Sequence, residues 1–224
     1  NWCVLAKNKA IVADERFCTS LSNHREAISP WLNLASPEQI EQYFDELGLA
    51  AYIDGIDERL ASINLLYCSS IWTRLSSILT IDFIYSKIKE NWDKTIISQR
   101  LVPLFEEVPE RLDSCKEKLD WNVLSQNLSV DFIQGNFANY VDYWDWSVIT
   151  QRVDAVFLHL HFKEYISFWN QGIAIEKITP LLSYDDIVDS ELERVWDWDL
   201  ISARVEDSVL IKILAEKMDF LDWD

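Results

Sequence analysis

The amino-acid sequence predicts an all-α fold, an α-solenoid of helix-turn-helix repeats about 25 residues long. Three observations favour it: Gly and Pro are scarce, Trp residues recur at a regular spacing, and several other columns keep the same register. The chain of 224 residues contains only 4 Gly and 5 Pro, against usual frequencies of roughly 7% and 5%. Because β-sandwiches and barrels need many turns rich in these residues, the composition disfavours them.

The repeat is defined by a Trp that opens each unit. Segments 119–125, 144–153 and 196–205 align without gaps when the Trp after Asp is numbered zero. The positions numbered zero are then Trp72, Lys94, Trp121, Trp146, Gln171, Trp198 and Trp223. Their spacings of 22, 27, 25, 25, 27 and 25 residues hold over about 150 residues, so the repeat is tandem.

Four further columns explain the first helix of each repeat. Position −1 is Asp or Asn in six of seven repeats, and these residues are preferred helix N-caps. Position −2 carries Trp92, Leu119, Trp144, Trp169, Trp196 and Leu221. Positions +3 and +7 are mostly apolar, and position +4 is mostly Ser or Thr. Positions 0, +3, +4 and +7 share one face of a helix, which predicts that the Trp residues are core and that the hydroxyls permit close packing.

A second helix is predicted to follow a break at position +8 or +9. Pro103 and Pro180 both occupy +9, and proline is tolerated in a first helical turn but poorly inside a helix. Positions +11, +12 and +16 would form the buried stripe of this helix. Isolated helices this short are marginal, so each must pack on neighbouring repeats.

The chain divides into two regions. Residues 71–224 are predicted to be tandem two-helix repeats that continue beyond the chain shown, since residues 221–224 open another repeat without the polar cap that terminal repeats carry. Such uncapped ends would also allow oligomerisation. Residues 1–70 are predicted to be divergent helical repeats or an N-terminal helical cap. Here Ser36 and Pro37 begin a helix that leads into the amphipathic run 40–49.

The charge balance bears on partners. The net charge is −18, which disfavours direct binding of nucleic acid and favours solubility, a basic partner or mimicry of a polyanion. Two acidic clusters are candidate docking patches, with ordinary solvated faces as the alternative. The first is Glu106, Glu107 and Glu110, and the second is Asp185, Asp186, Asp189, Glu191 and Glu193.

No residues are predicted to be catalytic, cofactor-binding or metal-binding. His159, His161 and Glu164 come nearest to a metal constellation, but zinc needs three or four convergent ligands, so surface or boundary histidines are favoured. No phosphate-binding, dinucleotide-binding or hydrolase motif is present. Four Cys residues without a CxxC pair indicate reduced thiols in the cytoplasm, and no apolar run has the length of a membrane span.

The cations at position +6 suggest contacts between repeats. Arg100, Arg152, Lys177 and Arg204 share this column. One hypothesis is a ladder of ion pairs with the Asp column at −1 of adjacent repeats, and the alternative is a solvated basic stripe.

The Trp-Asp-Trp-x-x-Ile/Leu-Ser/Thr signature at residues 144–150 and 196–202 resembles the tandem WDWxxLS-type repeats of large bacterial proteins. The resemblance covers residues 70–224 and implies a helical repeat that accompanies other domains, some with nucleic-acid-handling or defence roles. It carries over no catalytic residue. The resulting expectation is a non-catalytic scaffold or recognition segment that binds another macromolecule, in the first place a protein. The alternatives are an acidic nucleic-acid mimic that inhibits a DNA-binding protein, and the non-catalytic arm of an enzyme whose active domain lies elsewhere.

Overall fold

The computed structural model describes residues 1–61, 69–192 and 194–217, and these residues contain helices and no strands. The predicted all-α class is therefore confirmed. The chain forms two compact units, Asn1–Asp120 and Trp121–Asp224. Cys68, Glu193 and the repeat that opens at Trp223 lie outside the described residues.

In the first unit, the helices are α1 (Trp2–Leu5), α2 (Lys9–Val12), α3 (Glu15–Ser20), η1 (Leu21–Asn23), η2 (Arg25–Ala27), α4 (Ile28–Leu32), α5 (Pro37–Tyr43), α6 (Leu49–Ala61), α7 (Ser69–Ile78), α8 (Ile81–Ser86), α9 (Lys94–Glu107), α10 (Glu110–Asp113) and η3 (Lys116–Lys118). In the second unit they are α11 (Trp121–Asn127), α12 (Val130–Asn136), η4 (Phe137–Tyr140), α13 (Trp146–Arg152), α14 (Ala155–His161), α15 (Gln171–Ile178), η5 (Thr179–Leu181), α16 (Tyr184–Ile187), α17 (Trp198–Arg204) and α18 (Asp207–Lys217).

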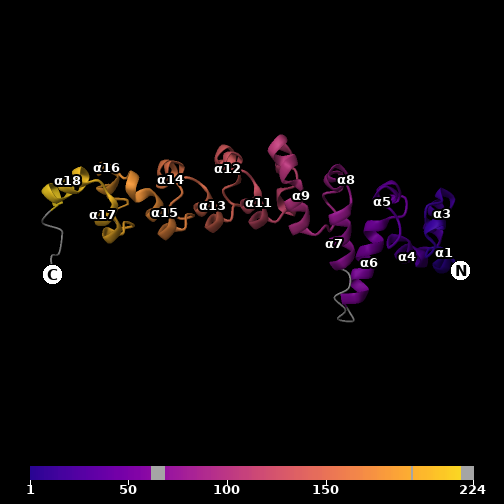
Figure 1. The fold of residues 1–224 in the computed structure, drawn as a ribbon. Helices are drawn as coiled ribbons and strands as arrows, with labels where there is room; N and C mark the ends of the chain where they lie inside the picture. The colour runs from indigo at the N-terminus through magenta and orange to yellow at the C-terminus, as the bar shows by residue number, and fades with distance from the viewer. Residues whose placement is uncertain (62–68, 193, 218–224) are drawn as a thin grey trace. The chain divides into compact units, whose positions relative to one another are not determined.

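First helices pack on first helices within each unit. In the second unit α11 contacts α13 and α13 contacts α15, and in the first unit α7 contacts α9. Figure 1 shows α12 and α14 of the second unit on the opposite side of the chain from α11, α13 and α15. Helix α13 is therefore packed between the first helices of both neighbouring repeats.

The column at −1 caps the first helices as predicted. The side chains of Asp93, Asp145, Asn170 and Asp197 accept hydrogen bonds from backbone N–H groups in the first turn of α9, α13, α15 and α17. These bonds satisfy N–H groups that have no partner within the helix.

In three repeats the second helix begins at +9, after a capping residue at +8. Helices α8, α12 and α14 follow the capping side chains of Thr80, Ser129 and Asp154. The prediction that Pro103 marks this break is wrong, because α9 continues through Pro103 to Glu107. Residue +8 of that repeat is Val102, which has no side-chain oxygen to cap a new helix.

The other proline also does not open a second α-helix. Pro180 lies in the short helix η5. Helix α16 starts later, after Ser183, whose side chain forms a capping box with Asp186. The second helix of this repeat is consequently displaced toward the C-terminus.

In the N-terminal third, the predicted helix start at Ser36 is confirmed, with a capping box to Gln39. The amphipathic run 40–49 is not one helix, however, because α5 ends at Tyr43 and α6 begins at Leu49. Gly48 between them has φ +57°, a left-handed conformation that glycine adopts at little cost. The turn at Gly48 therefore separates two helices that periodicity alone would join.

The hydroxyl column at +4 joins consecutive repeats. Ser76, Ser98, Ser125 and Thr150 are fully buried. Their oxygens accept the backbone N–H of the next −1 residue, namely Asp93, Asp120, Asp145 and Asn170, at 2.9, 2.7, 3.0 and 3.2 Å. A buried hydroxyl thus satisfies the N-cap residue of the following repeat, which accounts for this column without catalytic chemistry.

Candidate interaction surfaces

The cations at +6 bind backbone carbonyls of the preceding repeat. Arg152 donates to the carbonyl oxygens of Ser125 and Leu128 in the last turn of α11 and just after it. Arg100 makes the same pair of bonds to Ser76 and Leu79. The last carbonyls of a helix lack partners within it and carry partial negative charge, so a cation there is stabilising.

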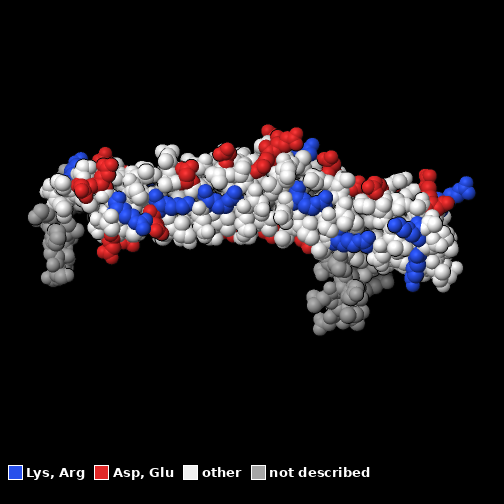
Figure 2. Space-filling view, viewed as in Figure 1, with Lys and Arg blue, Asp and Glu red and all other residues white. Residues whose placement is uncertain are grey.

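The ion-pair ladder with the −1 column is therefore wrong. No ion pair within the described ranges joins a +6 cation to a −1 carboxylate, and Arg204 pairs instead with Glu176, at 3.1 Å. Lys177 donates to the carbonyl oxygens of Thr150, Gln151 and Val153. Burial lowers the pKa of Lys177, against the opposing charge of Asp154. Figure 2 shows Lys and Arg side chains following one another along one face of the second unit.

The first acidic cluster lies at a helix junction. Glu106 and Glu107 end α9, and Glu110 begins α10. All three side chains are exposed. Carboxylates at a helix C-terminus are unfavourable in the field of the helix, so Glu106 and Glu107 do not serve helix stability by their position. The cluster remains a predicted docking patch.

The second acidic cluster is partly occupied by internal partners. Asp186 lies 3.2 Å from Nε2 of His159, and Lys163 bridges Asp189 and Glu191 at 2.8 and 2.7 Å. Burial would raise the pKa of Asp186, but hydrogen bonds from Ser183 and the charge of His159 outweigh it and lower the pKa. The Lys163 hydrogen bond lowers the pKa of Asp189. Asp185 is exposed.

The two histidines have separate surroundings. His159 faces Asp186, whereas His161 lies 3.9 Å from Glu164 and packs on Phe157 with ring centroids 4.6 Å apart. Within residues 1–61, 69–192 and 194–217, His, Cys, Asp and Glu side chains form no group of three able to hold a metal ion. The histidines join repeats and pack against aromatic rings.

Indole rings couple consecutive repeats. The Trp residues at −2 are buried, with 4–6% exposure, as the periodicity predicted. Three Trp residues at position 0 meet the next −2 Trp edge to face in the pairs Trp72/Trp92, Trp121/Trp144 and Trp146/Trp169, at centroid distances of 4.9, 5.1 and 4.8 Å and interplanar angles of 83°, 85° and 84°. The prediction that position-0 Trp residues are core is wrong for Trp198, which is 38% exposed. Edge-to-face pairs add to the stabilisation from burial.

The sequence reasoning did not single out aromatic residues at −3. Tyr143 packs on Trp121 at 5.0 Å and 34°, and Phe168 packs on Trp146 at 4.9 Å and 30°. Phe168 is 39% exposed. The sequence signal that could have revealed these residues is an aromatic side chain three positions before position 0 of the next repeat.

Exposed aliphatic side chains gather on α14. Val156 and Leu160 are 59% and 74% exposed. They are four residues apart and share a helix face. Leu181 in η5, which contacts α14, is 41% exposed. None of the three belongs to a signature column.

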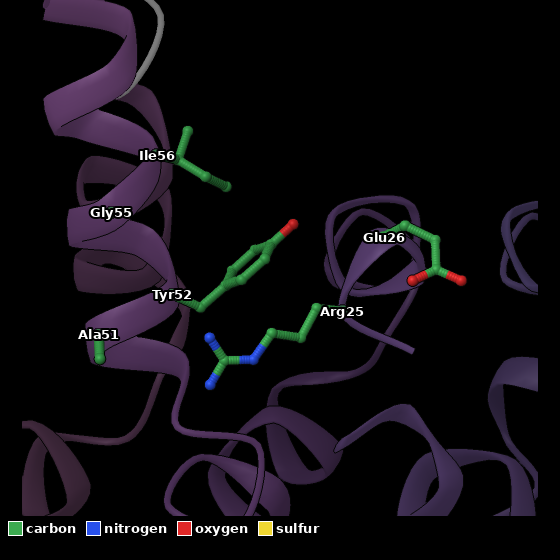
Figure 3. A pocket seen from close by; sticks show the side chains of 6 residues that line it. All are labelled: Arg25, Glu26, Ala51, Tyr52, Gly55 and Ile56. Carbon is green, nitrogen blue, oxygen red and sulfur yellow. The ribbon is translucent and has the colours of Figure 1, made fainter. Parts of the chain in front are cut away.

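A pocket of about 360 Å³ lies between η2 and α6. Figure 3 shows the hydroxyl of Tyr52 and the guanidinium of Arg25 extending into the space between these elements, while the carboxylate of Glu26 points away. Arg25, Glu26 and Ala51 are exposed, so the pocket opens to solvent. Its described lining contains no pairing of nucleophile and base.

Two further observations concern the setting of the protein. Along the described parts of the chain, no helix has the length and apolar character needed to cross a membrane. Cys3, Cys18 and Cys115 are free thiols, and burial raises the pKa of Cys18, and that of Cys115 to about 11.

Comparison with known protein families, curated proteins and solved structures gives no match.

Proposed function

We propose that this chain is a non-catalytic α-solenoid scaffold whose surface binds another protein. The observation that carries the proposal is the use of the signature residues. The Asp at −1, the hydroxyl at +4 and the cation at +6 make contacts within and between repeats in both units. Because the recurring residues make the contacts that build the repeats, we expect the variable positions to bind the partner protein.

The variable positions on the second helices support a binding role. Position +10 is Asp131, Val156 and Leu181 in three successive repeats of the second unit. The exposed Val156 and Leu160 give α14 an apolar outer face. Helix α12 instead has the charged Asp131 at position +10. Exposed apolar side chains that cluster on one helix are a feature of protein–protein contacts.

The cysteines and the repeat signature support a cellular setting for the protein. The reduced thiols of Cys18 and Cys115 support a cytoplasmic protein. The WDWxxLS-type signature supports a role as the recognition segment of a larger bacterial protein, with defence as one setting that the resemblance implies.

Small-angle X-ray scattering tests the solenoid. A compact domain of 224 residues has a radius of gyration of about 17 Å. At about 25 residues each, the 224 residues would form about nine repeats if residues 1–70 are divergent repeats. Stacked at roughly 9 Å each, these would form a rod about 80 Å long with a radius of gyration of about 25 Å. We expect the larger value for the monomer, and a value near 17 Å would contradict the solenoid.

Affinity capture tests the binding role. We expect the full chain to retain a defined set of proteins that the double variant Val156→Ser/Leu160→Ser loses at least tenfold. The matched control Asp131→Ser changes position +10 of the preceding repeat and should retain them. Circular dichroism establishes that all three chains are helical. If no captured protein depends on α14, this surface is not the recognition site.

The nucleic-acid mimic predicts another outcome. Its captured proteins would bind DNA, and DNA would displace the chain in a salt-sensitive way. That result would replace the scaffold proposal with the mimic.

A further inference from the structure

Four aromatic side chains form a rigid, partly exposed surface in the second unit. They are Trp121, Tyr143, Trp146 and Phe168, and we call them the aromatic ledge. Trp146 is held by a hydrogen bond from Nε1 to the carbonyl oxygen of Val141 at 3.0 Å and by its edge-to-face contact with Trp169. Phe168 packs on it in a tilted arrangement and keeps 39% of its surface exposed. Rigid aromatic anchors lose little entropy on binding.

The ledge extends over two consecutive repeats. Trp121 and Tyr143 form the same tilted ring contact one repeat earlier, and the helices α11 and α13 that begin at Trp121 and Trp146 pack on each other. Position −3 is not a signature column, since Val195 and Lys118 occupy it in other repeats. The repeat architecture therefore does not require Tyr143 and Phe168 to be aromatic.

Two carboxylates beside the ledge have no cationic side chain paired with them among the described residues. Asp142 precedes Tyr143 and is exposed. The side-chain partners of Asp145 are the neutral Asn122 and Ser147, whose hydrogen bonds lower the pKa of Asp145. Among the described residues, no cation forms an ion pair with Asp142 or Asp145. Aromatic faces also attract cations, and the whole chain has a net charge of −18.

We propose that the aromatic ledge binds an extended polypeptide segment rich in arginine or lysine. This inference rests on the proposed protein-binding function and names the chemistry of the partner. Packed helices lie about 8–10 Å apart, and a chain in the polyproline II conformation advances about 3.1 Å per residue with three residues per turn. Basic side chains three residues apart in such a chain would therefore point the same way and reach the two ring pairs.

Fluorescence anisotropy with the full chain tests the proposal. The probe is a labelled peptide with Arg at every third position. The controls are a peptide with the same spacing of Glu and a peptide of equal charge whose Arg residues are contiguous. We expect the spaced Arg peptide to bind most tightly and the Glu peptide to show no binding.

Variants separate ring recognition from general attraction to an acidic protein. Phe168→Ser should weaken binding at least tenfold, whereas Phe168→Tyr should preserve it. The matched control Ile211→Ser removes an exposed apolar side chain of α18, outside both the ledge and the α14 surface, and should leave binding unchanged. Asp142→Asn should weaken it severalfold. Far-UV circular dichroism shows whether Phe168→Ser remains folded. If that variant is unfolded, loss of peptide binding by Tyr143→Ser tests the ledge instead.

The inference is overturned if folded Phe168→Ser and Tyr143→Ser both bind like the unmodified chain, or if all basic peptides bind equally. If proteins captured through Val156 and Leu160 persist after such a result, the scaffold function stands and only the ledge is excluded. If no protein is captured but the ledge binds the peptide, the α14 surface fails and the ledge remains.

Discussion

Truncation of Trp169 to alanine is expected to lower the free energy of unfolding by about 3–5 kcal/mol. Trp169 is 4% exposed, and its ring lies edge to face with Trp146 and stacked on Phe137 at 5.3 Å and 12°. Its Nε1 donates to the carbonyl oxygen of His161 at 3.3 Å. The substitution leaves a cavity, removes two ring contacts and leaves that carbonyl without this donor. Urea denaturation followed by circular dichroism measures the change.

Trp198→Ala is the matched control for this prediction. Trp198 occupies position 0 and is 38% exposed, so its truncation should cost less than half as much. Neighbouring repeats can unfold separately in a repeat protein. The dependence of the unfolding free energy on urea concentration should therefore be compared between the variants as well. Equal losses for the two variants would contradict the assignment of the −2 column as the main indole core.

Replacement of Arg152 by alanine is expected to lower the free energy of unfolding by about 2–3 kcal/mol. The variant loses two hydrogen bonds from a charged donor to the carbonyl oxygens of Ser125 and Leu128, and such bonds contribute about 1.5–3 kcal/mol. Arg152→Lys is the matched control and should cost less than half as much, since Lys177 makes equivalent bonds one repeat later. Urea denaturation measures both.

A double-mutant cycle distinguishes these hydrogen bonds to backbone carbonyls from the ion-pair ladder with the −1 column. Asp197→Asn preserves a capping side chain and removes its charge. Lys177 lies in the repeat next to that of Asp197. With Lys177 bound to carbonyls of the preceding repeat, the effects of Asp197→Asn and Lys177→Ala should add to within about 0.5 kcal/mol. A coupling above about 1 kcal/mol would restore the ladder.

The repeat itself could be predicted from the sequence because its determinants are local. The Asp residues before the first helices bond to N–H groups two or three positions away, so spacing along the chain suffices. The same holds for Thr80, Ser129 and Asp154 before the second helices. The break expected at Pro103 was wrong: α9 continues through Pro103, and Val102 before it has no side-chain oxygen to cap a new helix.

The candidate surfaces depended on contacts between repeats. The sequence suggested one docking patch that includes Asp186, Asp189 and Glu191. In the structure these carboxylates form ion pairs with His159 and Lys163, which lie more than twenty residues away in the sequence. The aromatic ledge likewise joins Trp146 to Phe168 across a repeat boundary. Charge and aromaticity were visible in the sequence, and exposure was not.

The sequence by itself determined that the protein is helical, where the capped helices begin, and that the Trp residues at −2 are core, since periodicity and capping act within a few residues. The tertiary structure alone decided the partners of the +6 cations. A cation meets both carboxylates and the carbonyls that end a helix, and only the packing of one helix on the next places those carbonyls within reach of Arg100, Arg152 and Lys177.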